Sequence, residues 1–346
     1  MTRRTYLVHG LHALALLAVV VVCLPSFFAV AQHSNTAPKP LFRDPVHDGA
    51  ADPSLIWNRG ENKWVMFYTN RRADLPSPDP ANVAWVHGTQ IGIAESADGA
   101  HWTYAGVAEI PYGKSDYTFW APDVIWDAGQ YRMFLTVVPG IFKDWNAPRE
   151  IIQLTSADLK HWTFVQKLPL PSVRTIDPYI LRVEDGTWRL WYKNENDHSY
   201  IHSIDSKDLL HWTADRIAVS DRPSEGPIAF FWKGSYWLIV DAWKGLGVYR
   251  SSDALHWTVQ RDNLLATPGT MPTDRSEGHH ADLVLNNGHA YLYYFVQQVG
   301  ADSDPAVPES SHHSVLQVVE LKEHNGVLTA NRNRPVSVSL EQHLKR

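Results

Sequence analysis

The sequence Ser-x-Asp-x-x-His-Trp-Thr occurs four times in this chain, and this repetition constrains the fold more than any other feature. The copies begin at Ser96, Ser156, Ser206 and Ser251. Each copy stands beside short apolar runs, and its Ser and Asp side chains can bond the backbone groups of a turn. We therefore interpret each copy as a turn between two strands of a repeated unit. The alternative, four metal or sugar sites built from the histidines, is disfavoured.

A second pattern alternates with the first. In each copy an acidic or histidine residue opens an apolar strand, and a turn and an aromatic-rich strand follow. The five copies open at Asp52, Asp123, Asp177, Glu225 and His280. Four-stranded propeller blades of about 40 to 50 residues plus loops would give this spacing. The two patterns together predict an all-β fold, a five-bladed β-propeller of four-stranded antiparallel blades.

The first 31 residues have the features of a secretory signal peptide. Two arginines precede an uncharged apolar run from Leu11 to Leu24, and the small residues Ala29-Val30-Ala31 follow. We expect cleavage after Ala31 and a secreted or periplasmic protein without a membrane segment. A retained anchor is the alternative, but the run is shorter than the roughly 20 residues that a span needs. Residues 32–346 are expected to form a single propeller domain, because five blades use all of this length.

Composition narrows the classes of partner. The chain has 15 Trp, 14 Tyr and 11 Phe, which favour pleated strands and flat surfaces for sugar rings. Its net charge is -6 and no basic stripe occurs, so nucleic acid is not an expected partner. The only cysteine, Cys23, lies in the predicted signal peptide. Disulfide, zinc-thiolate and cysteine-nucleophile chemistry are therefore not expected in the mature chain.

The residues that open the first strands should meet, because the first strand of each propeller blade lines the central axis. Clustered acids raise one another's pKa values, and such clusters are usually kept for function. One protonated and one ionised carboxyl group beside a sugar ring can hydrolyse a glycoside. We expect Glu225, with its long side chain beside Gly226, to be the general acid and Asp52 the general base. Asp177 would orient the acid and adjust its pKa.

The chain resembles the five-bladed propeller glycoside hydrolases of family 43 and their relatives over about residues 44–300. The resemblance rests on the ordered motifs Ala51-Asp52-Pro53, Trp120-Ala121-Pro122-Asp123, Ile176-Asp177-Pro178, Glu225-Gly226-Pro227 and Gly278-His279-His280. It implies the same three roles for Asp52, Asp177 and Glu225, with inversion at the anomeric carbon. It also implies a histidine near the axis beside a calcium ion or a water molecule. His280 is the expected counterpart and metal neighbour, and His279 is the alternative. No cofactor is required for the chemistry.

Two departures from related families matter. The invertase-type propellers of the family 32 group carry Asn-Asp-Pro, Arg-Asp-Pro and Glu-Cys motifs, whereas this chain has Ala51-Asp52-Pro53, Ile176-Asp177-Pro178 and Glu225-Gly226. This difference disfavours fructoside chemistry. The chain also resembles family 117, which acts on anhydrogalactose-capped algal sugars with a histidine as the acid. His280 therefore stays open as an alternative acid.

Further residues are expected to contact the substrate: Arg71, Arg72, Trp120, Asp123 and His280, with Trp145, Trp191 and Trp243 as weaker candidates for stacking. Indole rings can stack on sugars, and a guanidinium can bind hydroxyls or a uronate carboxylate. We expect an exo-acting glycosidase of arabinofuranosidase, xylosidase or galactosidase type, acting on a plant or algal oligosaccharide or polysaccharide. The alternatives are a noncatalytic carbohydrate-binding propeller and a phosphorylase. The sequence does not indicate an oligomeric state.

Overall fold

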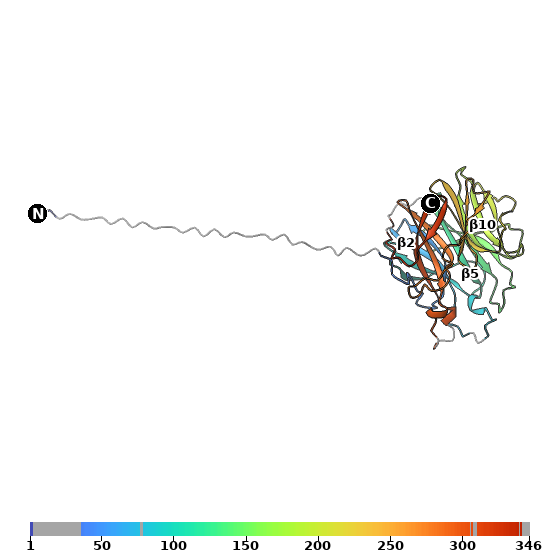
Figure 1. Ribbon diagram of the computed structural model, residues 1–346, viewed down its shortest axis with the longest axis horizontal. Coiled ribbons are helices and arrows are strands. Elements are labelled where there is room, and N and C mark those ends of the chain that lie inside the picture. Colours follow the sequence, from blue (N-terminus) through green and yellow to red (C-terminus); the bar gives the residue numbers. More distant parts are fainter. Residues whose placement is uncertain (3–35, 77–78, 305, 307–309, 339, 341–346) are drawn as a thin grey trace. The chain divides into compact units, whose positions relative to one another are not determined.

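The computed structural model describes residues 1–2, 36–76, 79–304, 306, 310–338 and 340. Residues 3–31 of the predicted signal peptide lie outside this range, so its cleavage stays a prediction. The described residues after residue 35 form five four-stranded antiparallel sheets (Figure 1). Within the described ranges, no helix is long and apolar enough to cross a membrane.

In each sheet the strands lie side by side in the order of the sequence, from the inner strand to the outer one. The blades are β1 (Ala50–Asn58), β2 (Lys63–Asn70), β3 (Gln90–Ser96) and β4 (Thr103–Val107); β5 (Thr118–Asp127), β6 (Gln130–Val138), β7 (Glu150–Ser156) and β8 (Thr163–Lys167); β9 (Thr175–Arg182), β10 (Trp188–Asn194), β11 (Tyr200–Ser206) and β12 (Arg216–Val219); β13 (Glu225–Trp232), β14 (Ser235–Asp241), β15 (Leu246–Ser251) and β16 (Thr258–Val259); β17 (His279–Asn286), β18 (His289–Gln297), β19 (Ser314–His324) and β20 (Val327–Ala330). Among the residues that the structure describes, three short 3-10 helices lie in loops: η1 (Ala84–Val86), η2 (Gly300–Asp302) and η3 (Ser310–His312).

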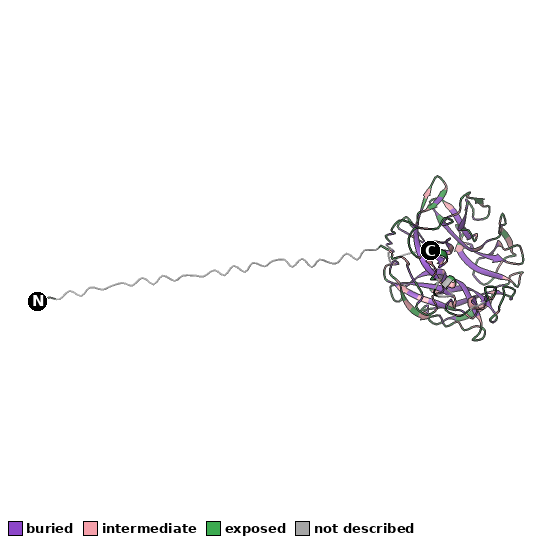
Figure 2. Cartoon of the chain, turned by 60° about the horizontal axis from the view of Figure 1, so that its bottom comes forward, coloured by how far each residue is buried: buried purple, intermediate pink, exposed green. Residues whose placement is uncertain are grey.

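The five inner strands contact one another in ring order, and β17 returns to contact β1. The predicted five-bladed propeller is therefore confirmed. Each blade is covered on both faces by its neighbours, so the inner two strands are buried along almost their whole length (Figure 2). Large aromatic side chains such as Tyr68, Trp191 and Trp237 fill the space between blades. This packing fixes the inner strands, and with them the residues that face the axis.

The Ser-Asp-His-Trp repeats form the turn after the third strand of the first four blades. In the first copy, the Ser96 hydroxyl accepts the N–H of Gly99 at 2.8 Å. The Asp98 carboxylate accepts the backbone N–H of His101 and pairs with its Nδ1, both at 2.8 Å. The other three copies have the same aspartate and histidine contacts. The interpretation of the repeats as structural turns is confirmed.

The fifth blade has a different outer edge. Its strands β19 and β20 are joined by Asn325-Gly326, and both residues have positive φ, as a tight hairpin turn requires. The N-terminal segment also joins this blade: Leu41 donates to the carbonyl of Leu316, and Leu316 donates to the carbonyl of Phe42. The beginning of the propeller thus lies on its last blade and holds the ring closed.

Candidate functional site

A bulge occurs at the same point in the first strand of the first four blades. Two residues of the inner strand there oppose one residue of the second strand. The first bulge residue has positive φ in each case: 48° at Asp52, 43° at Ala121, 58° at Asp177 and 52° at Gly226. The second is always proline, which lacks an N–H and so suits a point where the ladder is interrupted. Bulges of this kind redirect side chains and are frequent beside active sites.

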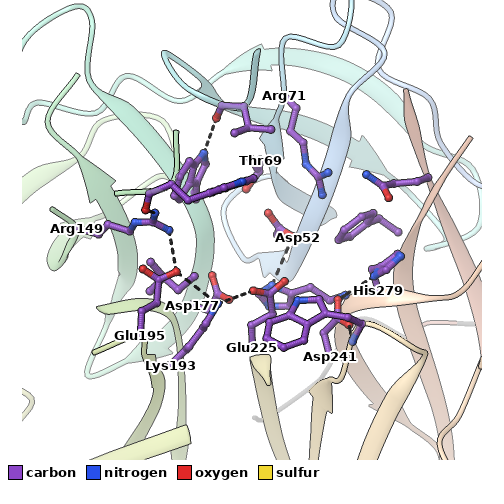
Figure 3. Close-up of a pocket in the computed structure, with 18 residues that line it drawn as sticks. Asp52, Thr69, Arg71, Arg149, Asp177, Lys193, Glu195, Glu225, Asp241 and His279 are labelled. Atoms are coloured by element: carbon purple, nitrogen blue, oxygen red, sulfur yellow. Dashed lines mark hydrogen bonds and ion pairs between the residues drawn. The ribbon is translucent and has the colours of Figure 1, made fainter. Parts of the chain in front are cut away.

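These bulges open onto a cavity of about 390 Å³. Figure 3 shows Asp52, Asp177 and Glu225 directed into it from three different blades. The structure therefore brings the three predicted catalytic carboxyl groups together. It also places other predicted residues on the wall, namely Arg71, Trp120, Trp145, Trp243, His279 and His280. The remaining lining residues are Thr69, Val86, Arg149, Ile176, Lys193, Glu195, Asp241, Phe295 and Gln297.

Lys193 is the partner of Glu225. Its ammonium lies 2.8 Å from the Glu225 carboxylate and 3.4 Å from Glu195, and only 6% of its side chain is exposed. Burial would raise the pKa of Glu225, but the charge and hydrogen bond of Lys193, together with a hydrogen bond from Trp243 and the charge of His280, lower it to about 2. The same two glutamates raise the pKa of Lys193 against the effect of its own burial. Glu225 is therefore ionised in this arrangement.

Asp177 has the opposite environment. Its carboxylate accepts the backbone N–H of Gly226 at 3.0 Å, and its own N–H donates to Thr136 at 2.9 Å. Burial is the main cause that raises its pKa to about 7, and the charges of Glu225 and Asp52 act in the same direction. The site thus separates one protonated from one ionised carboxyl group. Below about pH 7, Asp177 rather than Glu225 carries the proton in this arrangement.

This separation predicts a pH-dependent stability. The pKa of Asp177 is raised in the folded state, so between about pH 4 and 7 this carboxyl ionises in the unfolded chain but stays largely protonated in the folded protein. The free energy of unfolding should therefore fall as the pH rises through this interval. Asp177→Asn keeps an oxygen for the Gly226 N–H but cannot ionise. We expect the variant to gain stability relative to the wild type across this interval, measured by thermal unfolding at matched pH values. A difference that does not change with pH would contradict the raised pKa.

Two histidines complete the axial side of the cavity. His280 Nδ1 lies 3.5 Å from the Asp52 carboxylate. His279 Nδ1 lies 3.1 Å from Asp241, and its ring stacks on Phe295 with centroids 5.0 Å apart. Burial opposes a charge on His279, but the hydrogen bond and charge of Asp241 raise its pKa overall. Asp241 also accepts the backbone N–H of His280 at 3.1 Å, so it holds both histidines in place.

Gly226 leaves the space that His280 occupies. A Cβ atom built on Gly226 would lie 2.5 Å from Cγ of the His280 ring, and its φ of 52° disfavours other residues. We expect Gly226→Ala to lower the free energy of unfolding by about 1–3 kcal/mol and to displace His280. Chemical denaturation would measure this loss. The control is Gly129→Ala, because Gly129 also has positive φ but no atom lies near its Cβ position; an equal loss in both variants would exclude the contact with His280 as the cause.

The expected calcium ion stays a prediction. No cluster of three or more potential metal-ligating His, Cys, Asp or Glu side chains occurs in the part of the chain that the structure describes. The residues around His280 therefore do not fit a metal held directly by protein side chains. His280 contacts Asp52 instead, and no step of the chemistry below uses a metal.

The structure corrects the placement of three predicted contact residues. Asp123 is 2% exposed and lies outside the cavity, where its carboxylate accepts the N–H of Ile180 at 2.8 Å and links two blades. The bulge residue of its blade is Ala121, two positions earlier. Arg72 donates to the carbonyl of Ala84 at 2.8 Å, away from the cavity lining. Trp191 is fully buried in the core between blades and cannot reach a sugar.

Sequence reasoning missed Lys193, Glu195 and Asp241. Lys193 and Asp241 occupy one ring of positions on the second strands, because each pairs with the residue just before the bulge of its blade. Thr69 and Thr136 hold the same position in the first two blades. The repeat does contain this pattern: the proline of each bulge marks the inner strand, and the residue of the second strand that pairs just before the bulge holds this position. Glu195 lies two residues past Lys193, at the position that Arg71 and Trp243 hold relative to Thr69 and Asp241, and all three line the cavity.

No protein-family model and no curated protein matches this sequence. Solved structures do match. A thermostable family-43 glycoside hydrolase superimposes with a TM-score of 0.63 and 17% identity, over 87% of this chain and 99% of its own. A family-43 β-xylosidase/α-arabinofuranosidase from a compost microbial metagenome, in complex with xylotriose, gives 0.60 and 16%, over 84% and 95%. A family-32 β-fructofuranosidase from Bombyx mori gives 0.60 and 16%, over 82% and 62%. The predicted resemblance to these propellers is confirmed for the fold.

Proposed function

We propose that this protein is a glycoside hydrolase that cleaves a glycosidic bond of a plant or algal oligosaccharide or polysaccharide with inversion. The observation that carries the proposal is the convergence of Asp52, Asp177 and Glu225 on one cavity. The fold is shared with family-43 hydrolases, which supports the same reaction class. The propeller alone does not specify a reaction, so the proposal rests on the site.

The reaction needs two proton transfers. Asp52 takes a proton from the water that attacks the anomeric carbon, and Glu225 gives a proton to the departing oxygen. Lys193 holds Glu225 ionised, so Glu225 must first gain a proton. Since Glu195 lies only 3.4 Å from the Lys193 ammonium, a small shift of Lys193 toward Glu195 when substrate enters would raise the pKa of Glu225. The charge of Glu225 raises the pKa of Asp177, and this electrostatic effect is reciprocal, so Asp177 adjusts the pKa of Glu225 further.

Exo action is the proposed mode. The cavity of about 390 Å³ is at the small end of ligand sites, which suits the terminal units of a chain better than its middle. Trp145 and Trp243 line it and are 51% and 45% exposed, so their rings can stack on sugars at the entrance. The matched xylosidase/arabinofuranosidase supports an arabinofuranosidase, xylosidase or galactosidase type of substrate.

One second candidate has a specific observation in its favour. His280 lines the cavity and faces Asp52, while Glu225 is tied to Lys193. A histidine acid, as in family 117, would use this arrangement without moving Lys193. His280→Gln would then abolish hydrolysis, whereas Glu225→Gln would leave part of it.

The test is hydrolysis of a panel of aryl glycosides and defined oligosaccharides by the purified protein. Proton NMR of the first product formed should show the anomer opposite to that of the substrate. Binding of glycans without cleavage would favour the noncatalytic propeller, and turnover that depends on phosphate would favour a phosphorylase. N-terminal sequencing of the exported protein would test cleavage after Ala31 and the proposed secretion.

A further inference from the structure

Five basic side chains line the cavity, and four of them have a carboxylate partner within 4.0 Å. The pairs are Arg149 with Glu195 at 2.9 Å, Lys193 with Glu225 at 2.8 Å, His279 with Asp241 at 3.1 Å and His280 with Asp52 at 3.5 Å. Arg71 is the fifth. Among the described residues, none forms a hydrogen bond or an ion pair with its guanidinium, which points into the cavity (Figure 3).

The position of Arg71 is fixed by its surroundings. Its backbone N–H donates to Gly49 at 3.0 Å, and its carbonyl accepts from Ala73 at 2.9 Å. The guanidinium carbon lies 4.4 Å from the centre of the Phe295 ring. This contact covers one side of the guanidinium and leaves its N–H groups free for the cavity. Gln297 lies two residues beyond Phe295 on β18, on the same face of the strand, and also lines the cavity.

A guanidinium without a partner is costly in such a place. Burial lowers the pKa of Arg71, although the charges of Asp52 and Glu225 favour its charged form. Buried charges are normally paired, and an arginine fork matches the two oxygens of a carboxylate. A planar carboxylate on the ligand would provide the missing partner, and the Gln297 amide would offer a further donor beside it.

We propose that Arg71 binds the carboxylate of a uronosyl unit, so that the substrate of this cavity is an acidic rather than a neutral glycan. The inference rests on the proposed function and narrows its substrate class. Arg71 would then determine specificity, since loss of its fork removes a charged interaction that a neutral sugar never makes.

Binding measurements test the role of Arg71 as a carboxylate site, and hydrolysis measurements test the proposed activity separately. Glucuronic and galacturonic acids, their methyl esters and the neutral sugars are titrated by NMR into the wild type, Arg71→Gln and Arg72→Gln. The acids should bind about 10- to 100-fold more weakly to Arg71→Gln than to the wild type. Arg72→Gln is the control and should match the wild type, because Arg72 lies outside the cavity. In the wild type, esterification alone should cause a similar loss.

Hydrolysis of matched uronides and neutral glycosides then shows whether kcat/KM follows the same order of preference as binding, with uronides ahead of neutral glycosides in the wild type. The proposal is overturned if acids, esters and neutral sugars bind the wild type equally, or if no uronic acid binds. It is also overturned if Arg71→Gln weakens acidic and neutral sugars alike. Arg71-dependent binding of uronic acids without any hydrolysis would support Arg71 as the carboxylate site and refute the hydrolase instead. If Arg71→Gln does not fold, two other measurements test the proposal: the binding of acids compared with their esters in the wild type, and the binding of acids to Arg71→Lys.

Discussion

Glu225→Gln is expected to lower kcat on a natural oligosaccharide by about 10²- to 10⁴-fold, the usual contribution of a general acid. The loss should depend on the leaving group. A dinitrophenyl glycoside departs without protonation, so the variant should cleave it at close to the wild-type rate. Asp52→Asn should lose a similar factor on both substrates, since every substrate needs the activated water. Initial rates on the two substrates, measured for each variant, distinguish the acid from the base.

Asp185→Asn is the matched control, because this aspartate is 70% exposed at a turn far from the cavity lining. It should behave as the wild type on both substrates. Circular dichroism and sugar binding confirm that an inactive variant is folded. Full activity in both Glu225→Gln and Asp52→Asn would refute the proposed mechanism. His280 would be the acid if Glu225→Gln lost the same factor on both substrates, while His280→Gln lost activity on the natural oligosaccharide but kept it on the dinitrophenyl glycoside.

Lys193→Met should shift the pH profile of hydrolysis. The ammonium of Lys193 is the largest cause that holds the pKa of Glu225 low. Without this charge the carboxyl should retain its proton to higher pH, by at least about one unit for an opposite charge at this distance. If Glu225 is the acid, activity is lost as the pH rises through its pKa, so the alkaline limb of kcat should shift upward. Rates from pH 3 to 9 measure the shift.

Methionine keeps the length and apolar stem of Lys193, and most of the side chain is buried. The control is Lys207→Met, since Lys207 is 70% exposed and lies outside the cavity lining. Its profile should match that of the wild type. A lower kcat with an unchanged pH profile would mean that Lys193 only orients Glu225. A shift of the alkaline limb to lower pH would contradict the proposed effect on the acid.

The propeller and part of the site could be predicted from the sequence because both depend on short motifs that repeat along the chain. A residue followed by proline marks each bulge, and Asp52, Asp177 and Glu225 could be assigned from such short motifs. Asp123 does not face the cavity because the bulge of its blade is Ala121-Pro122, so the proline and not the acidic residue marks the equivalent position. Trp191 illustrates another limit: an indole on a blade strand looks the same in the sequence whether it faces sugar or core.

The sequence by itself determined the number of blades, the strands that line the axis and the positions of Asp52, Asp177 and Glu225 on them, because repeat spacing and bulge residues act within a short stretch of chain. Only the tertiary structure decided which carboxyl group carries the proton and which cation of the cavity has no hydrogen bond or ion pair from the described residues. Those properties depend on charges brought within about 4 Å from different blades. Lys193 is 32 residues from Glu225 along the chain but in contact with it in space, and electrostatic interactions follow distance in space rather than along the chain.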